Sequence, residues 1–167
     1  MDAIDFKALI ENHIGDDHKL TVDENSSPKA LLIAAEKIES VCAFLRDNPQ
    51  TYFDLLSCLT AIDNGPEANT MEVIYNLYSI PLNHSLMLKT SIMRDDPKID
   101  SISHIWKTAN WHERETYDLF GITFNNHPDL RRILMPADWE GYPMRKDYEE
   151  PETYRGMKTI RTEQEPS

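Results

Sequence analysis

Apolar and polar residues alternate along the middle of the chain. Residues 52–62 are rich in aromatic and apolar side chains, and residues 71–80 and 85–93 place apolar side chains at alternate positions. A period of two is typical of β-strands that bury one face. Turn-forming segments, Asn-Gly-Pro at 64–66 and Pro-Leu-Asn-His at 81–84, separate the three stretches. The pattern therefore predicts three antiparallel strands joined as a meander.

Helical spacing precedes these strands. Residues 2–14 form a short amphipathic pattern, and Gly15 directly after it is a typical helix C-cap. Residues 20–23 predict a short strand. A second helix is predicted from residue 27 to residue 47, because Ser-Pro is a favourable helix start and Asn-Pro a typical stop. One face of this helix carries the apolar residues Leu31, Ala34, Ala35, Ile38, Val41, Cys42 and Leu45.

Helical spacing returns after Pro97. Ser101 is predicted to cap a short helix, and the inward residues of that helix are Ile102, Ile105 and Trp106. Asn110 stands three residues before Glu113, as in a capping box, and Gly121 marks the end of a helix over residues 111–120. Helices combined with a meander predict an α+β fold, a two-layer sandwich with helices packed on a mainly antiparallel sheet.

Residues 111–120 carry the densest group of titratable side chains. Arg114 and Asp118 are four residues apart, so they are predicted to pair on the helix surface, a contact worth about 0.3–0.5 kcal/mol. Glu113 and Glu115 lie about 200° apart around the helix and cannot act as a carboxylate pair. A capping and salt-bridging role for these charges is favoured over acid–base chemistry. His127 is a further candidate base, although a histidine before a proline turn is more often structural.

The segment from Pro128 onward differs in kind from the rest. Prolines at 128, 136, 143 and 151 recur about every eight residues, so no long helix or strand is predicted there. The segment contains paired bases and several aromatic residues, namely Arg131, Arg132, Arg145, Lys146, Trp139, Tyr142, Tyr148 and Tyr154. We therefore divide the chain into an α+β domain, 1–127, and an extended arm, 128–167. An arm that docks on another protein and an arm folded over its own sheet fit the composition equally well.

Composition and charge exclude several classes of function. The chain has 167 residues, with 17 Lys and Arg against 29 Asp and Glu, and the formal charge of −12 argues against nucleic-acid binding. Five scattered glycines form no phosphate-binding loop, two cysteines cannot hold an iron–sulfur cluster, and six histidines show no zinc spacing. We expect neither a signal peptide nor a membrane span. We also expect no cofactor in this chain.

Four segments together resemble a known family. Residues 113–122 (ERETYDLFGI) and 127–134 (HPDLRRIL) are similar to the signature of the C subunit of proton-pumping NADH-quinone oxidoreductase, the 30 kDa subunit family of respiratory complex I. Residues 138–148 and 53–63 resemble the same family's C-terminal segment and first long strand. One departure is Asn126, where the family usually has glycine; asparagine tolerates the positive φ of such a turn.

The resemblance implies a non-catalytic scaffold subunit in the quinone module of the hydrophilic arm of the complex. Its expected neighbours are chiefly the B, D and I subunits, and it is expected at the cytoplasmic side of the inner membrane, attached only through the complex. NADH, FMN, iron–sulfur clusters and quinone are implied for the complex and none for this chain. The implied interface residues are Glu113, Arg114, Glu115, Asp118, His127, Arg131, Arg132, Trp139, Tyr142, Arg145 and Lys146.

Two other functions are compatible with the sequence, and the proposed role of the arm makes one prediction about stability. The same scaffold role in a ferredoxin-fed or hydrogenase-type relative of the complex fits the sequence equally well, because the electron-input site lies in other chains. An enzyme acting alone, with His127 or His112 as its base, is the competing class. If the arm serves only partners, truncation after Met135 is expected to leave the stability of the domain nearly unchanged.

Overall fold

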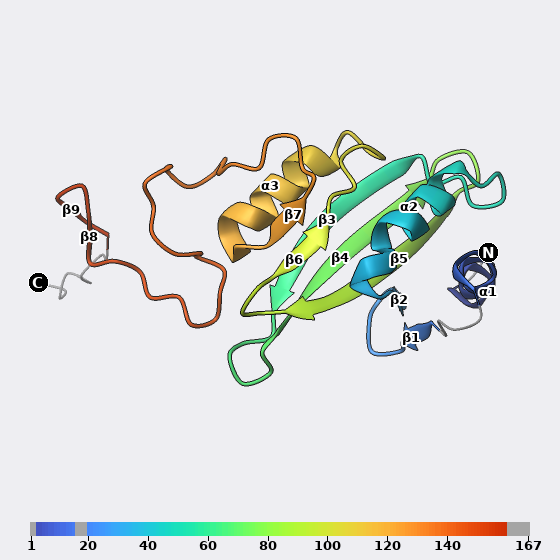
Figure 1. Cartoon of the computed structure of the whole chain (residues 1–167), viewed down its shortest axis with the longest axis horizontal. Coiled ribbons are helices and arrows are strands. Elements are labelled where there is room, and N and C mark those ends of the chain that lie inside the picture. Colours follow the sequence, from blue (N-terminus) through green and yellow to red (C-terminus); the bar gives the residue numbers. More distant parts are fainter. Residues whose placement is uncertain (1–2, 16–19, 160–167) are drawn as a thin grey trace, which may run out of the picture.

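The computed structural model describes residues 3–15 and 20–159. A five-stranded sheet with the order β1-β2-β5-β4-β3 forms the centre of the molecule (Figure 1). Its strands are β1 (Thr21–Asp23), β2 (Ala30–Leu32), β3 (Leu55–Asp63), β4 (Thr70–Ser79) and β5 (His84–Met93). The pairs β3–β4 and β4–β5 are antiparallel, so the predicted meander is confirmed. Strand β2 extends the sheet by pairing parallel to β5.

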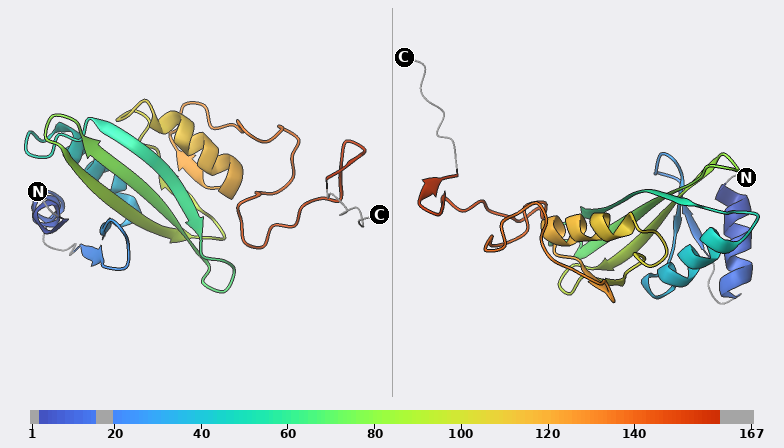
Figure 2. Two further views of the ribbon diagram at one scale, coloured as in Figure 1. Left: turned by 180° about the vertical axis from the view of Figure 1, so that it is seen from behind. Right: turned by 90° about the horizontal axis from the view of Figure 1, so that it is seen from above.

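Helix α2 (Ile38–Asp47) lies across one face of the sheet, and the strands stand in front when the molecule is seen from behind (Figure 2). Helix α1 (Ala3–Ile14) ends at Gly15, whose N–H donates to the Glu11 carbonyl at 3.0 Å, as the C-cap pattern predicts. The core between sheet and helices includes the fully buried Phe6, Val41, Tyr75 and Leu88. The α+β architecture with a mainly antiparallel sheet is confirmed.

The predicted start of the second helix is wrong. Residues 30–32 form strand β2, and helical structure begins only with the 3₁₀ turn Ala35–Lys37 that leads into α2. Leu31 is fully buried because it lies beside Leu88 of β5 in the sheet, where the backbone of β5 offers hydrogen-bond partners. A strand of three residues buries the same leucine as the predicted helix, and tertiary pairing overrides local propensity here.

The region before α3 (Ala109–Phe120) also differs from the prediction. Strand β6 (Lys98–Asp100) pairs parallel with β7 (Thr123–Asn125), and residues 101–108 form turns where a short helix was expected. The N-cap of α3 is Thr108, so Asn110 lies inside the helix and caps nothing. Gly121 ends α3 in the left-handed conformation with φ of 77°, as predicted.

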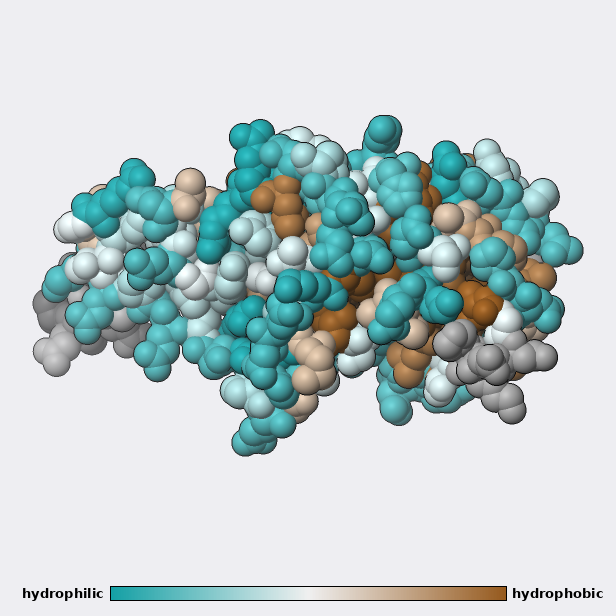
Figure 3. Space-filling model, viewed as in Figure 1, coloured by the Kyte–Doolittle hydropathy of each residue, from teal (hydrophilic) through white to brown (hydrophobic). Residues whose placement is uncertain are grey.

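The segment after Pro128 runs away from the sheet beyond α3 (Figure 1). Within its described residues, 128–159, the only regular structure is the short hairpin of β8 (Thr153–Tyr154) and β9 (Met157–Lys158). The face of this segment visible in Figure 3 is mostly polar, whereas apolar residues gather over the sheet and helices. Across the described residues, no helix has the length and apolar character needed to cross a membrane.

Candidate functional site

The first part of the arm is fixed to the domain by buried charges. We call this place the arm seat and define it as Asp63, Arg94 and Asp118 of the domain together with Arg132, Tyr142, Arg145, Lys146 and Asp147 of the arm. Its residues come from the ends of β3, β5 and α3, which meet at the same end of the sheet as the arm (Figure 1). The contacts of the arm seat cross the boundary that was predicted at residue 127. The division into two parts stays a prediction.

Asp118 is the first anchor of the arm seat. It lies in the last turn of α3 with its side chain fully buried. Its Oδ2 accepts three backbone N–H groups in a row, from Ile133 at 2.9 Å, Leu134 at 2.7 Å and Met135 at 2.9 Å. Its Oδ1 accepts Nη1 of Arg132 at 2.9 Å. One carboxylate thus fixes three consecutive residues of the arm and the arginine before them.

The electrostatics of Asp118 follow from these bonds. Burial acts to raise its pKa, but the three N–H donors and the Arg132 guanidinium outweigh burial and leave the pKa below its usual value. The carboxylate is therefore charged at neutral pH, and it cannot serve as an acid that exchanges protons there. Its chemistry is that of a structural anion.

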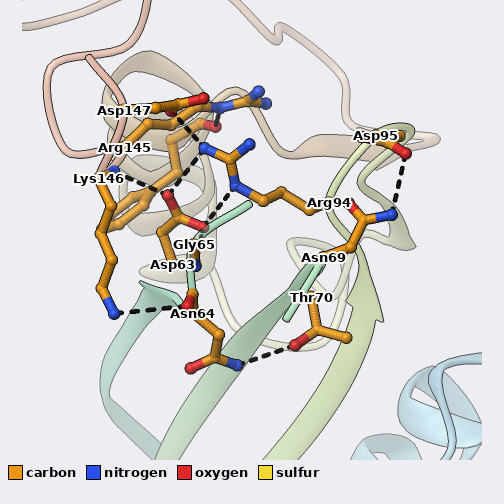
Figure 4. Close-up of polar contacts among 11 residues, drawn as sticks. Asp63, Asn64, Gly65, Asn69, Thr70, Arg94, Asp95, Arg145, Lys146 and Asp147 are labelled. Carbon is orange, nitrogen blue, oxygen red and sulfur yellow. Dashed lines mark hydrogen bonds and ion pairs between the residues drawn. The ribbon is translucent and has the colours of Figure 1, made fainter. Parts of the chain in front are cut away.

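Asp63 and Arg94 form the second anchor (Figure 4). Arg94 donates through Nε to Asp63 Oδ1 at 2.8 Å and through Nη2 to Oδ2 at 3.1 Å, a bidentate pair with both side chains buried. The arm joins this pair twice: the Lys146 N–H donates to Asp63 Oδ2 at 2.8 Å, and Asp147 pairs with Arg94. Gly65 N–H completes the bonding of Asp63 at 3.0 Å.

The pKa of Asp63 falls to about 2. Burial opposes this shift, and the Arg94 guanidinium and the Lys146 and Gly65 N–H groups outweigh it. In turn, hydrogen bonds from Arg94 to Asp63 and Asp147 raise the pKa of Arg94. All three side chains are charged across the physiological range, so this anchor persists at any pH at which the fold exists in the cell.

Tyr142 forms the aromatic part of the arm seat. Its ring lies within 5.1 Å of the Arg132 guanidinium and 4.9 Å of the Arg145 guanidinium, in cation–π geometry. Arg145 is also fixed by its Nε–H, which donates to the Phe120 carbonyl at 2.7 Å. The ring packs on Gly121, where an added Cβ would stand 2.6 Å from it. Glycine is therefore required at the end of α3 both for its positive φ and for this close approach.

Several predicted roles are corrected by this geometry. Arg114 and Asp118 are both buried and do not pair with each other on the helix surface; Asp118 binds the arm, and Arg114 Nε donates to the Arg131 carbonyl at 3.3 Å. Glu113 is fully buried and accepts Ser101 Oγ–H and Ile102 N–H, so it is no surface cap. Propensity alone does not reveal such burial, because the hydrogen-bond partners of each buried group are distant in sequence.

The predicted basic residues of the arm are largely bonded within the chain. Arg132 donates to Asp118 and to the Gly141 carbonyl, Arg145 to Phe120, and Lys146 Nζ to the Asn64 carbonyl at 3.4 Å. Arg131 remains exposed and pairs with Asp129. These bonds show what the arm bases contact within the chain, and their predicted contact with neighbouring subunits stays a prediction. The first part of the arm therefore folds back on its own domain. Docking of the arm on another protein stays a prediction.

The remaining predicted residues occupy separate positions. Glu115 is exposed on α3, and the buried His127 side chain lies at the base of the arm. Trp139 lies further along the arm, where its indole N–H donates to Tyr148 Oη at 3.1 Å and its ring packs on Tyr154. Asp138 accepts Tyr154 Oη–H and the Arg155 guanidinium, so residues 138–155 form a closed loop.

Sequence reasoning missed Asp63, Arg94 and Asp147. A signal existed for two of them: Asp63 continues the buried alternation of Leu59 and Ala61 on β3, and Arg94 continues that of Thr90 and Ile92 on β5. A charge in phase with a core face requires a buried partner. Among the described residues, no group of three or more His, Cys, Asp and Glu side chains is arranged to hold a metal ion.

Comparison with known proteins identifies the family. The family described as "Respiratory-chain NADH dehydrogenase, 30 Kd subunit" matches residues 31–154. The chain belongs to this family. A relative from Chlorobium phaeobacteroides, named as the C subunit of NADH-quinone oxidoreductase, is 39% identical over 151 residues, which are 90% of each chain. The relative of the same name from Geobacter sulfurreducens is 47% identical over 130 residues, covering 77% of this chain and 79% of its own. The resemblance carried by residues 113–134 is thereby confirmed.

Two solved structures share the fold of this 30 Kd subunit family member. A trypsin-resistant fragment of Nqo5 matches with a TM-score of 0.61 at 24% identity, covering 74% of this chain and 97% of the fragment. A chain of the membrane-bound sulfane sulfur reductase, an archaeal respiratory membrane complex, matches with a TM-score of 0.68 at 22% identity, covering 85% of this chain and 84% of its own. At these identities the likeness concerns the fold.

Proposed function

We propose that this chain is a structural subunit of NADH-quinone oxidoreductase that carries no cofactor and orients its neighbours through the arm. The observation that carries the proposal is the arm seat. Two buried anchors use charged groups to hold an irregular segment in one conformation. A segment that is already fixed loses less conformational entropy when it binds. Such a segment is therefore suited to contact a partner.

The arm seat also determines which side chains of the arm are exposed to solvent. Leu134 and Met144 have backbone N–H groups bonded to Asp118 and Leu119 at the end of α3, yet their side chains are 59% and 54% exposed. Trp111, at the other end of α3, is 62% exposed. Large apolar side chains held rigidly at the surface are typical anchors of protein interfaces. The proposed contact groups of the arm are therefore Leu134 and Met144, rather than the basic residues that the sequence favoured.

The proposed setting is the quinone module at the cytoplasmic side of the inner membrane, with the B, D and I subunits as neighbours. NADH, FMN, the iron–sulfur clusters and quinone are then handled by other subunits, which together move electrons from NADH to quinone and translocate protons. The contribution of this chain is positional, since electron transfer and quinone binding require neighbours held within a fraction of an ångström or so.

Affinity purification of the tagged chain from its own cells in mild detergent tests this function. We expect the B, D and I subunits to co-purify together with a flavin-containing module that oxidises NADH, while the isolated chain is colourless and free of iron and flavin. Co-purification without such a module would indicate the ferredoxin-fed or hydrogenase-type alternative. Flavin or iron bound in stoichiometric amount to the isolated chain would contradict the proposal.

Substitution of the exposed apolar residues tests the role of the arm. Leu134→Asp and Met144→Asp are expected to reduce assembled complex severalfold, because each places a charge in the proposed interface, while the isolated chain keeps its melting temperature. Ile80→Asp is a matched control, since Ile80 is 62% exposed in the turn between β4 and β5, at the other end of the sheet from the arm. Equal assembly of all three variants would exclude Leu134 and Met144 as contact groups.

A further inference from the structure

Glu113 and His127 form a buried titratable pair outside the arm seat. Both side chains are fully buried, and Oε2 of Glu113 lies 3.8 Å from Nε2 of His127. The pair stands where three segments meet: helix α3, the turn over residues 101–103, and the turn over residues 127–131 that begins the arm. We call this place the α3 joint.

The hydrogen bonds of the pair define the tautomer of His127 and the two donors that Glu113 meets. His127 Nδ1 accepts the Asp129 N–H at 3.0 Å, so the ring proton is on Nε2, which is 3.1 Å from the Asn110 carbonyl. Glu113 accepts Ser101 Oγ–H at 2.6 Å and Ile102 N–H at 2.7 Å. A neutral imidazole thus has both nitrogens bonded and offers no cation to the carboxyl group.

Groups on the other elements supply no cation either. Cys42 of α2 and Tyr75 of β4 face the joint from the core, and burial raises the pKa of both, so both are neutral. Asp100 of β6 is an acidic group whose charge acts on Tyr75. Arg114, the nearest cation on α3, is bonded to the Arg131 carbonyl and lies near Asp129.

This environment changes the titration of the pair. Burial raises the pKa of Glu113 to about 7, against the opposing effect of the bonds from Ser101 and Ile102. Burial also lowers the pKa of His127, and the charge of Arg114 adds to that effect. Near neutrality, therefore, the imidazole is uncharged and the carboxyl group is at its titration midpoint.

We infer that Glu113 holds a proton below neutral pH and releases it to solvent above neutral pH, which loosens the α3 joint at residues 101–103 and 127–131. In this step the carboxyl O–H bond breaks, the proton goes to water, and an uncompensated carboxylate remains among buried groups. Hydration of that charge requires the turns to separate from α3. The joint is thus a pH-sensitive contact at the base of the arm.

Thermodynamic linkage determines whether a rise in pH stabilises or destabilises the joint. The folded-state pKa of Glu113 lies above the unfolded value of about 4.3, so its stabilising contribution is complete below that value and is lost as pH rises through about 7. The anchors of the arm seat behave oppositely, because the pKa of Asp63 is lowered to about 2 and its contribution is lost only in acid. A rise of pH to about 7 therefore loosens the joint, while the anchors of the arm seat stay charged.

Amide hydrogen exchange on the full chain between pH 5 and 8 tests the inference. We expect the protection factors of the Ile102 and His127 amides, relative to those of Tyr75 and Leu88 in the sheet, to fall by up to about tenfold per pH unit between pH 5 and 7 and to level off above 7. Glu113→Gln, which cannot ionise, is expected to keep a constant ratio. Glu115→Gln, at an exposed position of the same helix, is expected to behave like the parent chain.

Two results would overturn the inference. One is a ratio in the parent chain that stays constant from pH 5 to 8, and the other is a Glu113→Gln variant that keeps the same pH dependence. If Glu113→Gln does not fold, titration of the Glu113 carboxyl carbon by NMR in the parent chain decides the question. A midpoint near 7 supports the inference, and a midpoint below 5 contradicts it.

Discussion

The meander and the arm seat are stabilised by different physics. In the meander, strands β3, β4 and β5 bury apolar side chains such as Leu59, Tyr75 and Leu88 against the helices. In the arm seat, charged side chains of Asp63, Arg94 and Asp118 are buried and hold an irregular segment through hydrogen bonds. Apolar packing is non-directional and adapts to substitution, whereas a buried charge depends on each of its partners.

The two regions differ in how strictly their side chains are specified. An apolar core accepts side chains of similar volume, because only shape and area must be conserved. Asp118 by contrast satisfies three consecutive N–H groups and one guanidinium, and no other residue type reproduces that arrangement. The part of the chain proposed to contact partners is therefore positioned by its least replaceable residues.

The largest effect is expected at Asp118. Asp118→Ala leaves the Arg132 guanidinium and three N–H groups without their buried acceptor, so we expect the free energy of unfolding to fall by about 3–5 kcal/mol in urea at pH 7. Asp118→Asn keeps one acceptor oxygen and is expected to lose less. A loss below about 1 kcal/mol for Asp118→Ala would show that the arm seat contributes little to the fold.

Truncation separates the arm seat from the rest of the arm. A chain ending at Met135 lacks Lys146 and Asp147, so Asp63 and Arg94 lose their arm partners, and we expect a loss of about 2–3 kcal/mol, the scale of a hydrogen bond to a charged group. This revises the expectation of unchanged stability drawn from the sequence. A chain ending at Glu149 keeps the arm seat and is expected to melt like the full chain. Equal melting of the two truncated chains would contradict the role of the second anchor.

A smaller effect is expected at the glycine that supports Tyr142. Gly121→Ala combines a positive φ of 77° with a Cβ placed 2.6 Å from the Tyr142 ring, and we expect a loss above the 1–2 kcal/mol or so that a left-handed alanine costs alone. Gly15→Ala is the matched control, because Gly15 has φ of 92° and open space around its added Cβ. Equal losses at the two glycines, measured by thermal unfolding, would mean that Tyr142 does not rest on Gly121.

The smallest effect is expected within the meander. Leu88 is fully buried on β5, and Leu88→Met conserves volume, so the loss is expected to stay below about 1.5 kcal/mol. Urea unfolding of this variant beside Asp118→Asn compares two nearly isosteric changes, one apolar and one charged. A larger loss for Leu88→Met than for Asp118→Asn would reverse the comparison between the two regions.

Much of the apolar architecture could be predicted from the sequence. The alternation over residues 52–93 and the glycines after residues 14 and 120 specify the meander and two helix ends, because period and cap chemistry are local properties. Strand β2 could not be predicted in this way, since Leu31 fits a helical face as well as a three-residue strand. Its conformation is decided by pairing with β5, which lies more than fifty residues away in sequence.

The arm seat was the part that local patterns could not predict. Arg114 and Asp118 have the spacing of a surface pair, yet each binds a group of the arm that begins at residue 128. Asp63 and Arg94 are 31 residues apart. The only local sign that they are buried is that each continues the alternating pattern of core positions, Asp63 on β3 and Arg94 on β5. Charge compensation over such distances depends on tertiary structure. The sequence therefore allowed the family signature to be recognised, but not the contacts that its charged residues make.

The most direct test of the proposed positional role is Arg94→Met in the cells that make the complex. The substitution removes the guanidinium that joins Asp63 to Asp147 and leaves a side chain of similar length. The amount of assembled complex on native gels and the NADH-quinone turnover per FMN in that complex are measured on the same membranes. A chain that only orients its neighbours predicts less complex with unchanged turnover per FMN. Full assembly with turnover lost would contradict the positional role.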